Sequence, residues 1–381
     1  MIRTWLIVSC SLSLVAPAAA QIVLPDPTGP HKVGTITVPW VDESRSEIVT
    51  DDPGDKREVI VQLWYPAQVS DGASAPYFPK LHVVLETMRS KFGRRGEQMA
   101  ESMAPLGSVK THAMEEAPLA STQPKYPILL FSPGGDMSRR FHTIQAEELA
   151  SHGYIVAVIS HAYSTFDVFS GDRLLMSHPR WNPPREASRE ERDRHFEELT
   201  DYLAADAMFV LNRLEQLNRN DPGSRFTGRL DLEKTAIIGH SRGGKTVSRI
   251  LTKDKRVRAG VIYDNLPPMV ERGKGFDRPL LMIRIAEWEA DDMKGLEQLF
   301  TNSSGAGYDV AVEGAGHRNF SDVHITDPKR FQSKIDPLRA LRIANAYTLA
   351  FLRTHLHDAP DDLLKGPSDL FPEVRFTLYK R

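Results

Sequence analysis

The sequence predicts an α/β fold, with helices on both faces of a mostly parallel central sheet. Short apolar runs, each bounded by glycine, proline or charged residues, alternate along the chain with amphipathic segments. Runs of this kind are typical of strands that are buried on both faces of a parallel sheet. Alternation of such strands with helical segments indicates that the helices cover the two faces.

The expected strands are short, and the first two differ from the rest. Residues 33–39 and 57–65 alternate or run apolar, with valine, isoleucine and tryptophan among them. The later runs, in chain order, are 127–132, 154–160, 234–239, 258–263 and 279–285, with 308–312 as a further candidate.

Helical patterns lie between and after these runs. The segment 139–151 ends at His152-Gly153, which is a typical C-terminal stop signal. The segment 185–217 is highly charged at first and then amphipathic. Two further helices are expected at 242–251 and 336–354.

The chain is long enough to form a single large domain. Its 381 residues can bury a substantial core without disulfides or a metal ion, so we expect one catalytic domain over residues 21–381. The formal net charge of -2 gives no reason to expect a nucleic-acid partner.

The first 20 residues have the pattern of a secretory signal peptide. Arg3 supplies a positive charge, Trp5–Val15 is a short apolar run, and Ala18-Ala19-Ala20 offers a cleavage site. The run is too short for a membrane-spanning helix. The only cysteine, Cys10, lies within this segment, so the mature chain would have no disulfide and no thiolate metal site. We expect an exported protein, either periplasmic or secreted.

Residues 66–124 carry no strand signal and are interpreted as a helical insertion. Within them, apolar residues recur at helical spacing, namely Leu81, Val84, Leu85, Met88 and Phe92. This stripe either packs onto the core or forms a lid that contacts the acyl group near the site.

A strand, a sharp turn and a helix meet at Gly239-His240-Ser241-Arg242-Gly243. This is the setting of a nucleophile elbow in an α/β-hydrolase fold. The turn is tight, and a side chain at Gly239 or Gly243 would crowd the neighbouring backbone. The pattern therefore predicts Ser241 as the nucleophile, against the alternative of a structural serine.

A serine nucleophile needs a base, which in this fold follows the last parallel strands. Among the 13 histidines, His317 lies in a late glycine-rich loop after a predicted strand, and it is the expected base. His324 is its nearest rival. We expect His240, inside the elbow, to point away from the base, and His161 to shape the floor of the site.

The base in turn needs a carboxylate that lies between serine and histidine in chain order. Asp264 and Glu287 both follow predicted strands in that interval. Spacing along the chain leaves both candidates open.

Two backbone amides should hold the negative oxygen of the reaction intermediate. The amide of Arg242, directly after the nucleophile, is the first. The second should come from the loop 131–136, where Pro133 lacks an N–H group and glycines allow close approach. We favour the amide of Gly135.

These stretches resemble the platelet-activating-factor acetylhydrolase family, in its secreted or type II branch. The resemblance runs from about residue 57 to about residue 325. Its motifs lie in residues 61–66, 126–135, 148–157, 231–244 and 316–322.

The resemblance implies a catalytic acid at Asp264, oxyanion amides at Gly135 and Arg242, and no metal or other cofactor. It also implies a small-molecule or lipid ester as substrate, transient contact with lipid surfaces, and no obligate protein partner. Two positions depart from the family pattern. Pro133 stands where the family usually has histidine, and Arg242 stands where it usually has phenylalanine.

We therefore expect a serine esterase that cleaves short-acyl carboxylic esters through a covalent acyl-enzyme. The resemblance implies the sn-2 acetyl group of a phospholipid as one substrate. The main alternative is a broad carboxylesterase or polyester hydrolase with the same three residues. An amidase or peptidase and a non-catalytic binding protein are further alternatives.

Overall fold

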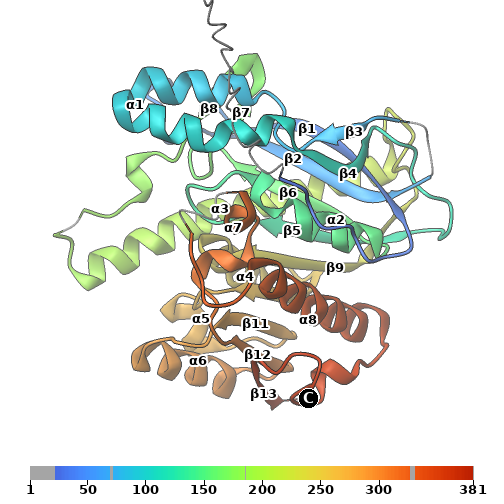
Figure 1. Ribbon diagram of the computed structural model, residues 1–381. Helices are drawn as coiled ribbons and strands as arrows, with labels where there is room; N and C mark the ends of the chain where they lie inside the picture. The colour runs from blue at the N-terminus through green and yellow to red at the C-terminus, as the bar shows by residue number, and fades with distance from the viewer. Residues whose placement is uncertain (1–21, 69–71, 185, 327–330, 381) are drawn as a thin grey trace, which may run out of the picture.

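The computed structural model describes residues 22–68, 72–184, 186–326 and 331–380 (Figure 1). The expected signal peptide, with Cys10, lies outside these residues. A sheet of 11 strands forms the centre of the molecule. From one edge to the other the strands are β13 (Val374–Lys380), β12 (Gly307–Val312), β11 (Leu280–Ile285), β10 (Val257–Tyr263), β9 (Leu230–His240), β5 (Tyr126–Ser132), β6 (Ile155–His161), β2 (Lys56–Ala67), β1 (Lys32–Ser46), β4 (Lys110–Glu115) and β3 (Ser74–Pro76).

The middle of the sheet, from β6 to β12, is parallel throughout. Every side chain of β5 and β6 is buried, as expected for strands covered on both faces. The carboxyl ends of parallel strands meet at one edge, so the loops after β5, β9, β10 and β12 come together there. The predicted mostly parallel sheet is confirmed by this arrangement.

Helices cover both faces of the sheet (Figure 1). Successive strand residues point to opposite faces and join two separate apolar clusters. One cluster contains α2 (Thr143–Ser151) and α8 (Pro337–His357), and the other contains α3 (Arg189–Arg219), α4 (Arg242–Lys253) and α6 (Ala290–Asn302). The shorter elements are η2 (Arg139–His142), β7 (Asp167–Phe169), η3 (Ser170–Asp172), β8 (Arg173–Leu175), η4 (Pro179–Trp181), α5 (Met269–Lys274), η5 (His317–Phe320), α7 (Val323–Thr326) and η6 (Asp362–Leu364).

The expectation that residues 66–124 contain no strand was wrong. β3 and β4 lie within this segment and extend the sheet beyond β1. β4 pairs with β1 over only two positions, opposite Gly34 and Thr35, and β3 has three residues. β3 has too few residues to show an alternating pattern, and the six residues of β4 mix polar and apolar side chains without regular alternation. Antiparallel β13, at the opposite edge, was also missed.

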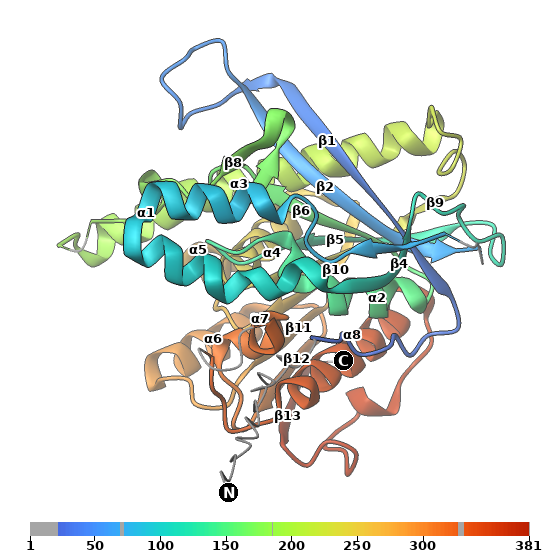
Figure 2. The same cartoon turned by 45° about the horizontal axis from the view of Figure 1, so that its top comes forward.

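The insertion does carry the expected helix, α1 (Leu81–Met103), followed by η1 (Ala104–Ser108). Gly93 has a φ of 50° and divides α1 into two segments, which lie side by side in Figures 1 and 2. Leu81, Val84 and Met88 are buried in an apolar cluster with Phe141, so this part of the stripe packs onto the protein. Phe92, the residue of the stripe that lies at the turn of α1, is 42% exposed.

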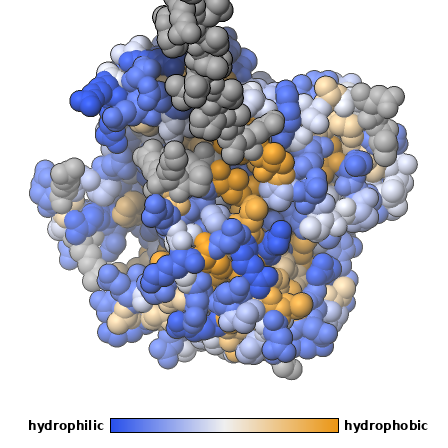
Figure 3. Space-filling model, viewed as in Figure 1, coloured by the Kyte–Doolittle hydropathy of each residue, from blue (hydrophilic) through white to orange (hydrophobic). Residues whose placement is uncertain are grey.

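An apolar groove of about 820 Å³ lies between the segment 23–28 and helices α2 and α8. Figure 3 shows apolar side chains gathered at the centre of this face, over α2 and α8. Among the described residues, no helix has both the length and the apolar character needed to cross a membrane.

A buried ion-pair network ties α3 to the antiparallel part of the sheet. The Arg57 guanidinium, fully buried on β2, donates to Asp206 at 3.0 and 2.6 Å and to Glu47 at 2.9 Å. His161, at the end of β6, donates from Nδ1 to Asp206 at 2.9 Å. Burial alone would raise the pKa of Asp206, but the Arg57 charge and the His161 hydrogen bond hold it well below its ordinary value.

Asp206→Asn is expected to lower the free energy of unfolding by about 3–5 kcal/mol, because it leaves the buried Arg57 charge uncompensated. Urea denaturation at pH 7 measures this loss. The carboxyl pKa is depressed in the folded state, so its contribution is complete above the unfolded-state pKa of about 3.9 and declines as the pH falls further. The difference between wild type and variant should therefore shrink below that pH. Glu97→Gln, which breaks the exposed pair with Arg89, should cost less than about 1 kcal/mol.

Candidate active site

Ser241 occupies a strained turn between β9 and α4. Its backbone has a φ of 53° and a ψ of −122°, which non-glycine residues rarely adopt. The Ser241 amide donates to the carbonyl of Tyr263 at 2.9 Å, and its carbonyl accepts from the Gly244 amide at 2.8 Å. These bonds hold the turn at the carboxyl edge of the sheet.

The glycines around Ser241 are required by close backbone approach. A Cβ atom at Gly239 would lie 2.2 Å from the carbonyl oxygen of Gly243. A Cβ atom at Gly243 would lie 1.9 Å from the carbonyl oxygen of Ser132, at the end of β5. Backbone atoms at these distances cannot move aside as a flexible side chain can, so both positions need glycine.

The structure pairs His317 with Asp264 and not with Glu287. His317 begins η5 after β12, and its Nδ1 donates to Asp264 Oδ2 at 2.6 Å. The Asp264 side chain is 3% exposed and that of His317 is 44% exposed. Glu287 is exposed and makes no hydrogen bond to His317 in the described part of the chain. With Nδ1 engaged by the carboxylate, His317 keeps Nε2 as the nitrogen that can accept a proton.

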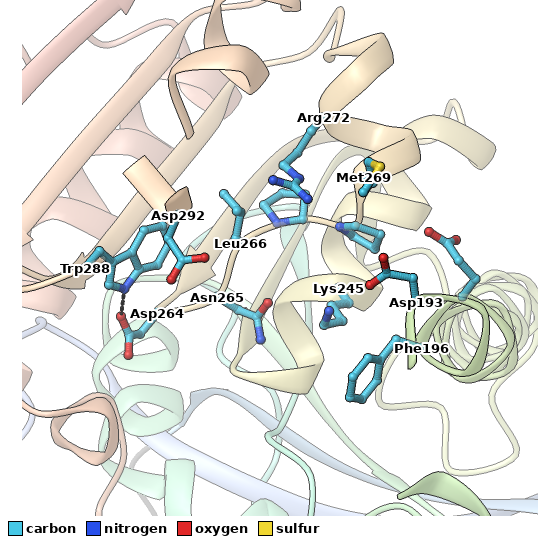
Figure 4. A pocket seen from close by; sticks show the side chains of 13 residues that line it. Asp193, Phe196, Lys245, Asp264, Asn265, Leu266, Met269, Arg272, Trp288 and Asp292 are labelled. Carbon is cyan, nitrogen blue, oxygen red and sulfur yellow. Dashed lines mark hydrogen bonds between the residues drawn. The ribbon is translucent and has the colours of Figure 1, made fainter. Parts of the chain in front are cut away.

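Asp264 is held by a second set of contacts that the sequence analysis did not anticipate. Its Oδ1 accepts from the Ile285 amide at 3.1 Å and from Trp288 Nε1 at 2.8 Å (Figure 4). The Arg284 guanidinium lies 5.2 Å from the centre of the Trp288 ring and is itself bonded to Asp309 at 2.9 Å. Trp288 therefore orients the carboxylate that orients His317. The only signal in the sequence was a tryptophan in the loop after a predicted strand.

We expected His240 to point away from His317. In the structure it packs against the His317 ring instead. The two ring centres lie 4.9 Å apart, and His240 Nε2 donates to the carbonyl of His317 at 2.9 Å. Burial and the neighbouring His317 hold the pKa of His240 well below its ordinary value, so the ring is neutral. The loop of His317 folds back over the end of β9, which the local sequence could not show.

His161 and His324 are both buried and neither contacts Asp264. The neutral His161 ring accepts from the Ser132 hydroxyl at 3.0 Å through Nε2, because its Nδ1 donates to Asp206. It therefore supports the loop after β5 from below, in line with the expected place at the floor of the site. Burial lowers the pKa of His324, whose ring packs against Phe331.

The loop after β5 lies against the elbow. A Cβ atom at Gly134 would be 3.3 Å from the Ser241 Cβ, and one at Gly135 would be 2.3 Å from the Arg242 guanidinium carbon. The Asp136 amide donates to the Ser164 carbonyl at 3.0 Å, whereas the Gly135 amide has no hydrogen-bond acceptor among the described residues.

The Arg242 amide lies at the start of α4, directly after Ser241. It opens α4 and, as the first amide of a helix, has no acceptor within that helix. The Arg242 side chain turns toward Ser164, with Nη1 3.3 Å from the hydroxyl oxygen. Burial lowers the pKa of this guanidinium, and Asp136 opposes the shift.

A polar cavity of about 350 Å³ adjoins Asp264 at this edge of the sheet (Figure 4). Lys245, one turn after Ser241 on α4, and Arg272 on α5 face acidic Asp193 and Asp292 across it. Lys245 lies 4.7 Å from the centre of the Phe196 ring, and burial lowers the pKa of its ammonium group. In the described residues, no group of three or more His, Cys, Asp or Glu side chains is arranged to hold a metal ion.

A strained serine on a strand–turn–helix, with a buried carboxylate bonded to a late histidine, defines a serine hydrolase of the α/β-hydrolase class. Residues 16–367 match the family described as platelet-activating factor acetylhydrolase, isoform II. The chain belongs to this family, and it is an ester-hydrolysing serine hydrolase that acts on carboxylic esters of small molecules or lipids.

Individual relatives agree with this assignment. The platelet-activating factor acetylhydrolase of Cavia porcellus is 29% identical over 345 residues, which cover 82% of this chain and 78% of that protein. A probable 1-alkyl-2-acetylglycerophosphocholine esterase of Arthroderma benhamiae is 26% identical, covering 96% of this chain and 97% of that one. The solved structure of a ferulic acid esterase from Streptomyces cinnamoneus superposes with a TM-score of 0.77 at 28% identity, over 94% of this chain and 100% of the other. This likeness confirms the predicted α/β-hydrolase fold.

Trp288→Phe is expected to lower kcat for p-nitrophenyl acetate about tenfold, because it removes one hydrogen bond to a charged carboxylate. Trp40→Phe, the same change at a buried position on β1, is the matched control and should leave kcat near the wild-type value. Steady-state kinetics well below both melting temperatures measure the effect. Equal kcat in the two variants would show that Trp288 does not orient Asp264.

Proposed function

We propose that the chain hydrolyses short-acyl esters with Ser241 as nucleophile, His317 as base and Asp264 as acid. The observation that carries the proposal is the 2.6 Å hydrogen bond between His317 and the buried Asp264, on the same sheet edge as the strained turn of Ser241. A buried carboxylate on Nδ1 leaves Nε2 unprotonated and stabilises the imidazolium that forms during the reaction.

The reaction proceeds by acyl transfer. His317 takes the Ser241 proton as the hydroxyl oxygen attacks the ester carbonyl, and the amides of Gly135 and Arg242 hold the resulting oxyanion. His317 then protonates the leaving alcohol. Water, activated by the same histidine, attacks the acyl-enzyme and releases the carboxylate.

A short acyl group suits the space beside the oxyanion loop. The Arg242 guanidinium lies directly against Gly135, within 2.3 Å of the position that a Cβ atom would take there. The bulk of this side chain narrows the room next to the proposed oxyanion amides. Relatives that are named for removing an acetyl group support the same limit. We therefore propose an acetylated glycerophospholipid as one substrate.

A broad carboxylesterase is the second candidate. Its support is the ferulic acid esterase, which superposes with a TM-score of 0.77 at 28% identity. An enzyme of this kind would accept aryl and other simple esters, and its alcohol or acyl portion could extend into the polar cavity beside Asp264.

The proposal extends to where the enzyme acts. We propose that residues 1–20 direct export and that residues 21–381 form one catalytic domain, periplasmic or secreted. Transient contact with lipid surfaces is part of the proposal, because a relative is named as an esterase of 1-alkyl-2-acetylglycerophosphocholine, which is a lipid.

Ser241→Ala and His317→Ala should each lower kcat by about 10⁶-fold, because the members of such a triad act as a unit. Asp264→Asn should lower it about 10⁴-fold, since the amide leaves the wrong imidazole tautomer. Glu287→Gln is the matched control and should stay near wild type. Hydrolysis of p-nitrophenyl acetate, with circular dichroism to verify folding, measures all four. A larger loss for Glu287→Gln than for Asp264→Asn would contradict the assignment of the acid.

Comparison of kcat/KM across substrates tests the substrate class. A 2-acetyl glycerophosphocholine should be cleaved faster than its long-chain 2-acyl analogue, and p-nitrophenyl esters should lose activity as the acyl chain lengthens. Equal rates across the series would favour the broad carboxylesterase. Turnover of matched amides would indicate an amidase instead. Failure of a fluorophosphonate probe to label Ser241 in the folded enzyme would contradict catalysis altogether.

A further inference from the structure

We infer that a cavity around Arg140, apart from the catalytic residues, binds a small, singly charged oxyanion such as a carboxylate. Arg140 lies in η2, only 5% exposed. Its guanidinium makes no hydrogen bond and no ion pair with any of the described residues. A buried cation of this kind needs a counter-charge, because removal of charge from water is costly.

The other buried arginines of the described chain all have acidic partners. Arg57 pairs with Asp206 and Glu47, and Arg284 pairs with Asp309. The remaining pairs are Arg139 with Asp167 and Arg249 with Glu271. Arg140 directly follows Arg139 and shares its burial, yet it forms no ion pair; burial lowers its pKa, and the charge of Glu115, across the cavity wall, opposes that shift without a direct contact. The protein therefore supplies counter-ions to its buried arginines in general, and the exception indicates a site that an external anion completes.

Arg140 faces open space. Two cavities, of about 440 and 280 Å³, lie between β1, β4 and the turn before α1, and they share Thr37, Pro79, Glu115 and Arg140 in their walls. None of the residues proposed for catalysis lines either cavity. The Thr37 hydroxyl is exposed in this wall and has no hydrogen-bond partner among the described residues.

The chemistry of the wall selects the ligand. A guanidinium presents paired N–H donors that match the two oxygens of a carboxylate or phosphate. Burial lowers the pKa of Arg140 to about 10, so the group remains a cation at neutral pH. Glu115 and Glu116 also line the larger cavity, and their charges disfavour a multiply charged anion. A monocarboxylate fits both conditions.

The site also adjoins the catalytic machinery through the backbone. The Arg140 amide donates to the hydroxyl of Ser138 at 3.3 Å, and Ser138 lies two residues after the loop 131–136. The next residue, Phe141, accepts from the amide of Asp322, in the segment that follows His317, at 2.8 Å. An anion held by Arg140 would steady this segment. Because ester hydrolysis releases a carboxylate, the site would accept the chemical class of the reaction's own product.

Thermal unfolding at constant ionic strength tests the proposal. Saturating sodium acetate, compared with sodium chloride, should raise the Tm of the wild-type enzyme by roughly 3 °C. Arg140→Gln should abolish this rise, and in acetate-free buffer it should melt at or above the wild-type Tm, because it removes a buried charge that no hydrogen bond or ion pair holds. Arg89→Gln, which removes the same charge from an exposed position, should keep the full acetate effect.

Two further arms separate the competing explanations. Sodium phosphate at the same ionic strength should raise the Tm less than acetate, and a larger rise would assign the site to a phosphate. Glu115→Gln should strengthen the acetate effect, because it removes a repelling charge. If Glu115→Gln instead lowers the Tm in acetate-free buffer and leaves acetate without effect, Glu115 is the counter-ion and the proposal fails.

Direct binding keeps the proposal testable if Arg140→Gln does not fold. Calorimetric titration of wild type with acetate should show saturable binding, and Arg140→Lys, which keeps the charge but loses the paired donors, should weaken it about tenfold. Absence of saturable binding to the wild-type enzyme would overturn the proposal. So would an acetate effect that persists unchanged in Arg140→Gln.

Discussion

The close contact between the turn at Ser241 and the end of β5 is the constraint on which the site depends. The Gly243 backbone packs so tightly on the Ser132 carbonyl that no side chain fits between them. This contact brings the loop after β5, with the proposed oxyanion amide of Gly135, beside Ser241 and holds Ser241 in its strained conformation. The parallel order of β9, β10, β11 and β12 then delivers Asp264, after β10, and His317, after β12, to the same edge. A site built from distant segments is thus aligned by backbone packing.

Hydrogen bonds and charge then orient the side chains of Asp264 and His317, which the backbone brings to this edge. Asp264 is buried, yet both of its carboxylate oxygens accept hydrogen bonds. Oδ1 accepts from the Ile285 amide and from Trp288 Nε1, and Oδ2 accepts from His317 Nδ1. His240 is held neutral by burial, so it braces the His317 loop without placing a positive charge beside the His317 ring. The polar cavity beside Asp264 and the cavity around Arg140 lie outside this framework. Both cavities are lined by charged side chains.

Much of the fold could be read from the sequence because long buried strands leave a strong local signal. All the expected strands are present, and so is the turn at Ser241; β1 extends seven residues beyond its predicted end at residue 39, and the other strands lie within a few residues of their predicted bounds. The misses have physical causes. β3 is too short for an alternating pattern, and the six residues of β4 show no regular alternation. β13 is the exception, because its apolar residues Val374, Phe376 and Leu378 alternate with polar ones, so its signal was present in the sequence and was overlooked. Trp288 was missed because nothing local distinguishes a tryptophan that bonds a carboxylate from one that only packs.

Residues adjacent in the chain were sufficient to predict the strained turn at Ser241, because strand, glycine-flanked turn and helix are all encoded within a dozen positions. The choice between Asp264 and Glu287 required the folded chain, because both follow parallel strands and only three-dimensional packing brings one of them to His317. The same holds for the inward turn of His240 and for the missing partner of Arg140. Each depends on contacts between segments far apart in sequence, for which local propensity carries no information.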